Sequence, residues 1–223
     1  KDNKILWLPD VFGYSAALPQ ILKKSGVDYF MTTKISWNEY NKMPYDTFMW
    51  EGIDGTKILT YFITTRDCDA PDSQHFTTYV GKMTPSEVMG SWKRFQQKDV
   101  SDEVLICYGY GDGGGGTTPE MVETAKRLSK GIPGCPKVEL STSLDFFKDL
   151  EKKAENAKRM PEWVGELYLE LHRGTYTSMA RNKKYNRKSE FALTDAELYS
   201  VMNKTLLNGE YKQSEINDMW RTV

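Results

Sequence analysis

The sequence has few of the residues that bind metals or form cross-links. Only 3 cysteines and 2 histidines occur among 223 residues. Cys68, Cys107 and Cys135 are far apart and form no Cys-x-x-Cys pair, so neither a disulfide framework nor a thiolate zinc site is predicted. His75 and His172 are too distant for a His-x-x-x-His metal motif. This cysteine usage fits a reducing, cytoplasmic setting.

A long apolar run and an excess of charge of one sign are also missing. No run approaches the roughly 20 apolar residues that span a bilayer, and no signal peptide is recognisable. With 30 basic and 31 acidic side chains the formal net charge is -1, which supports neither nucleic acid nor an anionic membrane as a partner. The content of 39% hydrophobic and 13% aromatic residues is typical of a globular protein, with one sizeable domain or one domain and part of another.

The N-terminal part of the chain predicts a β-α-β unit. Ile5–Leu8 is expected to form a short buried strand, which a loop connects to a helix capped by Ser15 and ended by Gly26. Tyr29–Thr33 is the second expected strand. Because the loops that follow parallel strands gather at the strands' carboxyl ends, residues just after Leu8 and Thr33 are expected near each other.

A hairpin and a long loop are predicted next. Asp54-Gly55 is a strong turn signal, since both positions tolerate positive φ, and it predicts pairing of Phe48–Trp50 with Lys57–Ile63. The polar, aperiodic residues Thr64–Thr84 predict an excursion loop, a kind of segment that can cover a functional site.

The rest of the chain predicts further helices and strands. Helices are expected at Thr84–Gln97 with a Thr84-Glu87 capping box, from Thr118 to about Gly131, and from Ser141 or Thr142 to about Ala157. Strands are expected at Glu103–Tyr108, Val138–Leu140 and Trp163–His172. The pattern is helical from about Ser189 and again at Glu215–Val223, with the boundary between the two parts expected between Ser178 and Ser189.

Asp10 is the first candidate for a chemical role. It follows an expected strand and precedes a helix, where parallel α/β folds bind their ligands. An aspartate there can also form an Asx turn or cap the helix. Other residues must therefore decide between a functional and a local structural role.

The expected strand Trp163–His172 carries two different faces. Period-two alternation places leucines on one face and polar side chains on the other. The polar residues are Glu166, Tyr168, Glu170 and His172. Two carboxylates and an imidazole beside an all-leucine face indicate a strand that lines a polar cavity, although a solvent-exposed strand shows the same pattern.

A glycine-rich loop, Gly109–Gly116, follows another expected strand and precedes a helix. Its backbone amides can approach a ligand closely, but it lacks the spaced glycines of a dinucleotide or phosphate loop. Asp112 within it suits the recognition of a sugar hydroxyl, with a flexible loop as the alternative. Trp37 and Tyr110 can stack on sugar faces, although aromatic residues on strands belong more often to the core.

Four segments in this order carry a family resemblance. They are Leu6–Ser15 with Leu18–Ile21, Thr33–Asn38, Tyr108–Gly116 and Trp163–Ser178. The first two resemble the nucleophile region of the α-mannosidases of glycoside hydrolase family 38. The other two are similar to the branch of that family with bacterial and vacuolar or cytosolic enzymes. Together the segments cover nearly the whole chain.

The resemblance implies retaining hydrolysis of terminal α-mannosidic bonds in oligosaccharides. Asp10 matches the aspartate that attacks the anomeric carbon and also binds zinc, so zinc is the implied cofactor. Glu170 is the preferred acid/base, Glu166 is the alternative, and Asp112 is also possible. The residues implied to bind substrate are Trp37, Asn38, Tyr110, Asp112, Tyr168 and His172.

The family's other zinc ligands, an upstream His-x-Asp pair and a downstream histidine, have no match here. The chain also opens without Met, on Lys1, directly before an expected strand. We therefore expect an internal piece of a longer enzyme, which on its own binds zinc weakly and is inactive.

The implied fold is α/β. Residues 1–180 would be the C-terminal portion of a seven-stranded β/α barrel, and residues 181–223 would begin a three-helix bundle. Two other functions fit the residues. One is a zinc-dependent polysaccharide deacetylase-like enzyme, which releases acetate and needs no nucleophile. The other is a non-catalytic carbohydrate-binding domain.

Overall fold

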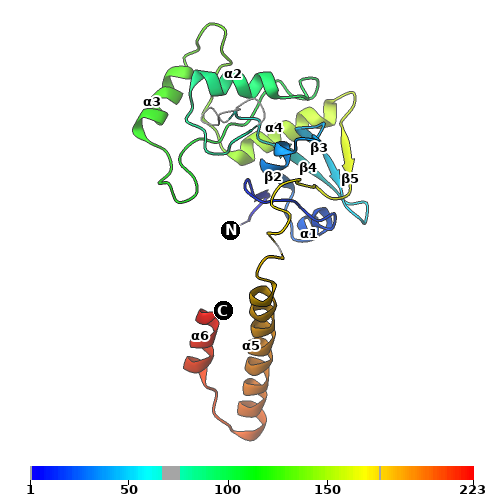
Figure 1. Ribbon diagram of the computed structural model, residues 1–223, viewed down its shortest axis with the longest axis vertical. Helices are drawn as coiled ribbons and strands as arrows, with labels where there is room; N and C mark the ends of the chain where they lie inside the picture. The colour runs from blue at the N-terminus through cyan, green and yellow to red at the C-terminus, as the bar shows by residue number, and fades with distance from the viewer. Residues whose placement is uncertain (1, 67–75, 176) are drawn as a thin grey trace. The chain divides into compact units, whose positions relative to one another are not determined.

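The structure is a computed structural model that describes residues 2–66, 76–175 and 177–223 (Figure 1). It divides into two compact units, Lys1–Arg173 and Gly174–Val223. The first combines a sheet with helices, and the second is helical, so the predicted α/β class is confirmed. Within the described ranges, no helix is long and apolar enough to cross a membrane.

Five strands form one mixed sheet in the order β1-β2-β4-β3-β5. The strands are β1 (Ile5–Trp7), β2 (Tyr29–Thr32), β3 (Thr47–Glu51), β4 (Lys57–Phe62) and β5 (Glu162–Val164). β1 pairs with β2, and β2 with β4, in parallel. The predicted hairpin is confirmed, because β3 and β4 are antiparallel and Gly55 has a φ of 82° in the turn between them. The carboxyl ends of β1, β2 and β4 therefore lie at the same edge of the sheet.

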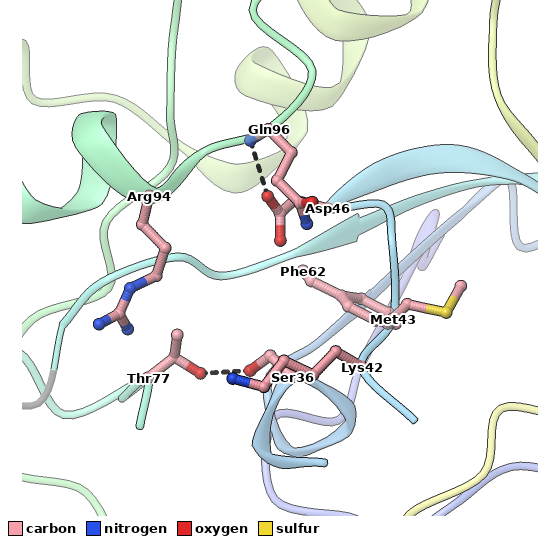
Figure 2. A pocket seen from close by; sticks show the side chains of 8 residues that line it. All are labelled: Ser36, Lys42, Met43, Asp46, Phe62, Thr77, Arg94 and Gln96. Atoms are coloured by element: carbon pink, nitrogen blue, oxygen red, sulfur yellow. Dashed lines mark hydrogen bonds between the residues drawn. The ribbon is translucent and has the colours of Figure 1, made fainter. Parts of the chain in front are cut away.

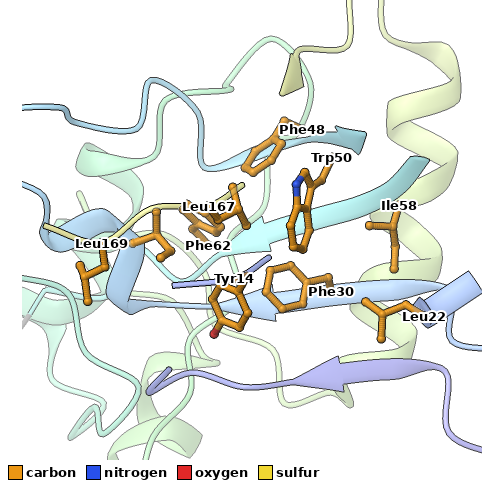
Figure 3. Close-up of a cluster of buried hydrophobic side chains, with 10 residues drawn as sticks. Tyr14, Leu22, Phe30, Phe48, Trp50, Ile58, Phe62, Leu167 and Leu169 are labelled. Atoms are coloured by element: carbon orange, nitrogen blue, oxygen red, sulfur yellow. The ribbon is translucent and has the colours of Figure 1, made fainter. Parts of the chain in front are cut away.

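Apolar side chains cover both faces of this sheet. Successive strand residues point to opposite faces, so Phe30 packs on one face while Tyr29 and Met31 pack on the other. Figure 3 shows the first face, where Phe30, Trp50 and Phe62 lie together with Leu167 and other buried side chains. The second face is covered by Phe95 and by Phe147 and Leu150. Burial on both sides explains why the strands have few polar residues.

Four helices belong to the first unit, and their capping residues set most of their starts. They are α1 (Leu18–Lys24), α2 (Pro85–Arg94), α3 (Pro119–Leu128) and α4 (Ser143–Asn156). The predicted Thr84-Glu87 capping box is confirmed, since the Thr84 hydroxyl accepts the Glu87 N–H while the Glu87 carboxylate accepts the Thr84 N–H. At the starts of α3 and α4, the hydroxyls of Thr118 and Thr142 accept the N–H groups of Met121 and Asp145, without the reciprocal bond of a capping box. These starts follow from local sequence.

Some helix boundaries of the first unit differ from the prediction. Ser15 does not cap α1, because its hydroxyl accepts the Ala17 N–H and the helix begins only at Leu18. α2 ends at Arg94 rather than near Gln97. The predicted end of α1 at Gly26 is confirmed by a φ of 76°, a conformation that glycine adopts readily.

The predicted strands Glu103–Tyr108 and Val138–Leu140 are wrong. Neither segment joins the sheet. The Leu105 N–H donates to the Tyr61 hydroxyl, 3.0 Å away, and Tyr108 forms only an isolated bridge with Gly81. The apolar residues of these segments pack under α3 and α4, so their pattern reflects burial without strand pairing.

The predicted strand Trp163–His172 is also wrong beyond Val164. Gly165 has a φ of 106° and ends the pairing of β5 with β3. After this turn Leu167 and Tyr14 exchange two backbone hydrogen bonds, with nitrogen to oxygen distances of 2.8 and 3.0 Å. The alternation of burial nevertheless continues, with Leu167 and Leu169 buried and Tyr168 exposed. The chain therefore changes its partner while keeping its two-sided pattern.

The second unit consists of α5 (Ala180–Leu207) and α6 (Gln213–Thr222), which runs back beside it (Figure 1). Their contact buries Leu193 and Ile216, and the Trp220 indole donates to the Glu197 carboxylate at 2.7 Å. α6 agrees with the prediction. α5 begins at Ala180 rather than near Ser189, because its first turns are almost entirely polar and give no apolar period. The predicted excursion loop lies partly, and His75 wholly, outside the described residues.

Candidate active site

The loop that carries Asp10 is fixed at the carboxyl edge of the sheet. Leu8 still follows β2, since its N–H donates to the Met31 oxygen. The Tyr14 hydroxyl lies 2.6 Å from the Leu8 oxygen and 2.7 Å from the Thr32 hydroxyl, which ties the far end of the loop to both strands. Asp10 lies between these anchors, where the parallel arrangement predicts a ligand site.

Both carboxylate oxygens of Asp10 have a partner. Oδ1 lies 3.2 Å from the ammonium of Lys34, and Oδ2 accepts a hydrogen bond from the Tyr79 hydroxyl at 2.9 Å. The Asp10 side chain is 38% exposed, whereas that of Lys34 is only 13% exposed. The carboxylate is thus held in one orientation and is still reachable from solvent.

Tyr79 connects Asp10 to Asp112. Its hydroxyl oxygen is 2.9 Å from Oδ1 of Asp112 as well as 2.9 Å from Oδ2 of Asp10, so the two carboxyl oxygens are less than twice that distance apart. Desolvation, followed by the hydrogen bonds to Asp112 and Asp10, raises the pKa of Tyr79, so the phenol keeps its proton. The phenol has one proton, so it donates to only one of the two carboxyl groups at a time.

The glycine-rich loop brings Asp112 to this position. Tyr110 and Gly116 exchange two backbone hydrogen bonds of 2.8 Å, which close the loop. At Gly111 a β-carbon would lie 3.2 Å from the Tyr79 ring, so glycine permits this close approach. Asp112 itself has a φ of 52°, a conformation that aspartate tolerates better than most residues. The Tyr110 side chain remains 43% exposed.

Lys34 and Trp37 come from a single 3-10 turn, η1 (Lys34–Trp37), directly after β2. Residues three apart in such a turn lie on the same side, and the Lys34 ammonium stands 3.5 Å from the centre of the Trp37 ring. The Trp37 indole donates to the Thr77 oxygen at 3.0 Å, which fixes the ring. The turn therefore orients the cation toward Asp10.

Glu170 and Asn38 form a separate group of contacts. The Glu170 carboxylate accepts the backbone N–H groups of Glu39, Tyr40 and Asn41 at 2.6 to 3.0 Å. Desolvation raises the pKa of Glu170, but these N–H bonds outweigh it and hold the pKa below its usual range. The Asn38 amide donates to the Tyr168 oxygen and accepts the Glu170 N–H, both at 2.8 Å. Both side chains thus fasten one loop to another.

The remaining predicted site residues are spread around these two groups. His172 has a φ of 59°. The centre of its ring lies 4.6 Å from that of Phe12, a residue that follows Asp10 closely in the sequence. The Tyr168 ring is exposed and faces the Arg173 guanidinium at 5.6 Å. Glu166 is exposed, and its backbone oxygen accepts the Trp163 indole N–H. The structure brings Asp10, Trp37 and Asp112 into one connected network. Among the described residues, Glu166 makes no hydrogen bond or ion pair with this network.

Two members of this network were not predicted from the sequence. Lys34 is the second residue after β2, so its position at the carboxyl edge was a usable signal. Tyr79 lies in the predicted excursion loop. The only signal for Tyr79 was that a loop of this kind can cover a functional site.

The residues that the structure describes do not complete a zinc site. Within residues 2–66, 76–175 and 177–223, no group of three or more His, Cys, Asp or Glu side chains could hold a metal ion. Asp10 alone offers a carboxylate of the expected kind, and the Lys34 ammonium already lies against it. The residues described here do not fit a zinc centre.

A cavity of about 320 Å³ is lined in part by Ser36 of η1 (Figure 2). Its lining comprises Ser36, Lys42, Met43, Asp46, Phe62, Thr77, Arg94 and Gln96. Asp46 is 6% exposed, and its Oδ2 accepts the Gln96 N–H at 2.8 Å. Burial raises the pKa of Asp46 to about 6. The cavity includes neither Asp10 nor Asp112, so it is distinct from the candidate active site.

A pair of neighbouring carboxyl groups, as at Asp10 and Asp112, is the arrangement that most glycoside hydrolases use. The comparison with protein families agrees with this class. Residues 1–166 match the "Glycosyl hydrolases family 38 N-terminal domain", and residues 170–223 match the "Alpha mannosidase middle domain". The chain belongs to glycosyl hydrolase family 38.

Relatives with known names support the same family. The chain is 41% identical to "Alpha-mannosidase G" of Dictyostelium discoideum over 97% of its length, and 38% identical to "Alpha-mannosidase" of Saccharomyces cerevisiae over 99%. It is 39% identical to human "Alpha-mannosidase 2C1" over 97%. It spans only 18 to 20% of these three proteins.

A solved structure shares the fold. It is an α-mannosidase from Enterococcus faecalis V583, with a TM-score of 0.51 and 16% sequence identity over 74% of this chain and 18% of that one.

Replacement of Asp46 by Asn should stabilise the chain at neutral but not at acidic pH. A folded-state pKa of about 6, above the ordinary 3.8, means that Asp46 contributes its full stability below pH 3.8 and loses it as the pH rises through 6. Asn carries no charge that must be buried. The free energy of unfolding of the Asp46→Asn variant should therefore exceed that of the unmodified chain by near zero at pH 4 and by on the order of 3 kcal/mol at pH 7.5. Urea unfolding at both pH values measures it, with the exposed Asp54→Asn as control. A pH-independent difference would contradict the assignment.

Proposed function

We propose that this chain is the part of a retaining α-mannosidase that carries the nucleophile Asp10 and the acid/base Asp112. The observation that supports this most directly is the Tyr79 hydroxyl, which lies 2.9 Å from both carboxyl groups. Their oxygens are therefore close enough for the separation of about 5 to 5.5 Å that retaining glycosidases use. A sugar that enters between them would exchange hydrogen bonds with Tyr79.

The contacts also support a division of roles between the two carboxyl groups. The Tyr79 hydroxyl lies between them, 2.9 Å from each. The Lys34 ammonium lies 3.2 Å from Oδ1 of Asp10, so a fixed cation stands beside the group that must act as a carboxylate. Asp10 is then the carboxylate that attacks the anomeric carbon, and Asp112 is the acid that gives its proton to the leaving oxygen. In the second step Asp112 takes a proton from a water molecule. The water oxygen attacks the anomeric carbon and so releases the sugar from Asp10.

Glu170 and Glu166 are less suitable as the acid. An acid must hold a proton before the reaction, whereas three backbone N–H groups around Glu170 favour its carboxylate. Within the described part of the chain, Glu166 makes no hydrogen bond or ion pair with the Asp10 network. We therefore prefer Asp112, which the sequence left open, and assign to Glu170 the task of holding Asn38 and its loop.

The proposed substrate is a terminal α-mannoside of an oligosaccharide. The names of the relatives support this substrate class. Trp37, Tyr110, Tyr168 and His172 are the proposed walls of the sugar site, with aromatic surfaces that suit the faces of sugar rings. The portion of a seven-stranded barrel, the start of a three-helix bundle and the cytoplasmic setting remain predictions. Free Cys107 and Cys135 support the last of these.

The isolated chain should bind zinc weakly and should not hydrolyse mannosides. Asp10 is the one zinc ligand that we propose in this chain. The Lys34 ammonium beside Asp10 repels a zinc ion. Calorimetric titration with Zn²⁺ and an assay with an aryl α-mannoside test both statements on the purified chain. Tight binding or rapid hydrolysis would contradict them.

Replacement of Asp10 by Ala in the full-length enzyme tests the proposed function. Loss of the nucleophile removes the covalent step, so turnover of an aryl α-mannoside should fall by on the order of 10⁴-fold or more. Affinity for mannose, measured by calorimetry, should change little because the walls of the site remain. Release of acetate from an acetylated polysaccharide by the unmodified enzyme would favour the deacetylase alternative, and sugar binding without any turnover would favour the binding domain.

Asp112→Asn and Glu170→Gln should have different kinetic signatures. Without its acid, Asp112→Asn should lose on the order of 100-fold or more in turnover of a mannoside with a poor leaving group, and much less in glycosylation by 2,4-dinitrophenyl α-mannoside, which leaves without protonation. Glu170→Gln should lower stability and raise KM, without dependence on the leaving group. The opposite pattern would return the acid role to Glu170.

A further inference from the structure

Lys34 is a buried cation in direct contact with the proposed nucleophile. Its side chain is 13% exposed, and its ammonium lies between Oδ1 of Asp10 at 3.2 Å and the Trp37 ring at 3.5 Å. The Tyr79 ring centre is 5.9 Å from the same nitrogen. Two aromatic rings and the protein thus surround the ion pair on the side away from solvent, where a charge interaction is stronger than in water.

The local backbone keeps the ammonium at this place. Lys34 opens the 3-10 turn directly after the fully buried strand β2, and Trp37 closes it. The ring of Trp37 is fixed through its hydrogen bond to Thr77, whose hydroxyl also lies 2.5 Å from that of Ser36. Lys34 therefore cannot move away from Asp10 without leaving the Trp37 ring.

We propose that Lys34 is a positioning residue that accelerates the release of mannose from Asp10, the second step of the reaction. This inference rests on the proposed function, since it needs a covalent bond between Asp10 and the sugar. The charge of Asp10 changes in opposite directions in the two steps. A fixed cation at Oδ1 therefore affects the steps differently.

The chemistry of the steps gives the direction. In the first step a carboxylate oxygen of Asp10 forms a bond to the anomeric carbon, the bond from that carbon to the leaving oxygen breaks, and the charge on Asp10 disappears. In the second step a water oxygen bonds to the anomeric carbon and gives its proton to Asp112. As this bond forms, the bond between the carbon and Asp10 breaks, and its electron pair returns to the carboxylate. Lys34 stabilises that returning charge, so it makes Asp10 a better leaving group.

Lys34→Met in the full-length enzyme provides the test, with Lys34→Arg as the conservative variant. Lys153→Met is the matched control, because Lys153 is also partly buried and paired with carboxylates, those of Asp102, Glu103 and Asp149. The substrate is 2,4-dinitrophenyl α-mannoside, whose glycosylation step needs no acid. Stopped-flow absorbance measures the burst of dinitrophenol, and mass spectrometry of the quenched enzyme measures the fraction that carries mannose.

Slow release of the sugar has a distinct signature. For Lys34→Met, kcat should fall by on the order of 100-fold. KM should fall with it, so that kcat/KM, which reports the first step, stays within about threefold. A burst of nearly one dinitrophenol per enzyme and an accumulated mannosyl adduct should accompany this. Lys34→Arg should recover most of kcat, and Lys153→Met should behave like the unmodified enzyme.

Other outcomes overturn the inference. An equal fall in kcat/KM and kcat, with no burst, would show that Lys34 does not act selectively on the second step. Lys34 would then accelerate both steps or only stabilise the fold. A raised KM with unchanged kcat would make it a sugar-binding residue. If circular dichroism shows that Lys34→Met is not folded, Lys34→Gln is measured in the same way and judged by the same criteria. If the unmodified enzyme does not hydrolyse the mannoside, the proposed function itself fails, and the role of Lys34 fails with it.

Discussion

Parallel pairing of β1 with β2 and of β2 with β4 is the constraint on which the candidate site depends. It places the carboxyl ends of three strands at one edge, so that Asp10, which follows β1, and Lys34, which follows β2, come within 3.2 Å. Tyr79 reaches the same edge on the segment that returns after β4. The antiparallel β3 cannot contribute in this way, because its carboxyl end lies at the opposite edge. The chemistry is therefore located by the direction of the strands.

The parts of the fold that local sequence determines were predictable. The Thr84-Glu87 capping box, the Thr142 cap and the Asp54-Gly55 turn each involve residues at most three positions apart, and each has a clear physical signature. The apolar pattern of Glu103–Tyr108 was misleading, because burial alone produces it when no neighbouring strand is present. Gly165 shows a related limit, since a single positive φ redirects the chain from β3 to Tyr14. Pairing partners are a property of the whole fold.

The candidate site was predictable to a smaller extent. Asp10 and Asp112 follow expected strands, and this position alone indicated a role. Their connection through Tyr79 was not predictable, because Tyr79 is 69 residues from Asp10 and lies in a segment without a periodic pattern. Glu170 was also a candidate. Its polar face left a site and a solvent-exposed strand both open, and the family resemblance made it the preferred acid/base. Its carboxylate accepts three backbone N–H groups, contacts that no sequence pattern indicates.

The carboxyl groups of this chain illustrate how surroundings assign function. Asp46 is buried with one backbone donor, and its pKa rises to about 6, whereas Glu170, with three such donors, has a lowered pKa. Asp10 and Asp112 differ from both because the neutral Tyr79 phenol joins them and the Lys34 ammonium lies against Asp10. This asymmetry is what a two-step displacement requires, since one group must remain ionised for attack while the other holds a proton.

The side chains that hold the site together are largely separate from those that stabilise the sheet. Phe30, Trp50 and Phe62 pack in the core, whereas the loops at the carboxyl edge are joined by polar contacts from Asn38, Glu170 and other side chains to backbone groups. Apolar packing is non-directional and tolerates small shifts, while a hydrogen bond weakens steeply when its angle changes. The positions of Asp10 and Asp112 therefore depend on the polar contacts at this edge more than on the total amount of buried surface. A change at Glu170 can disturb the geometry of the site while the sheet beneath it remains folded.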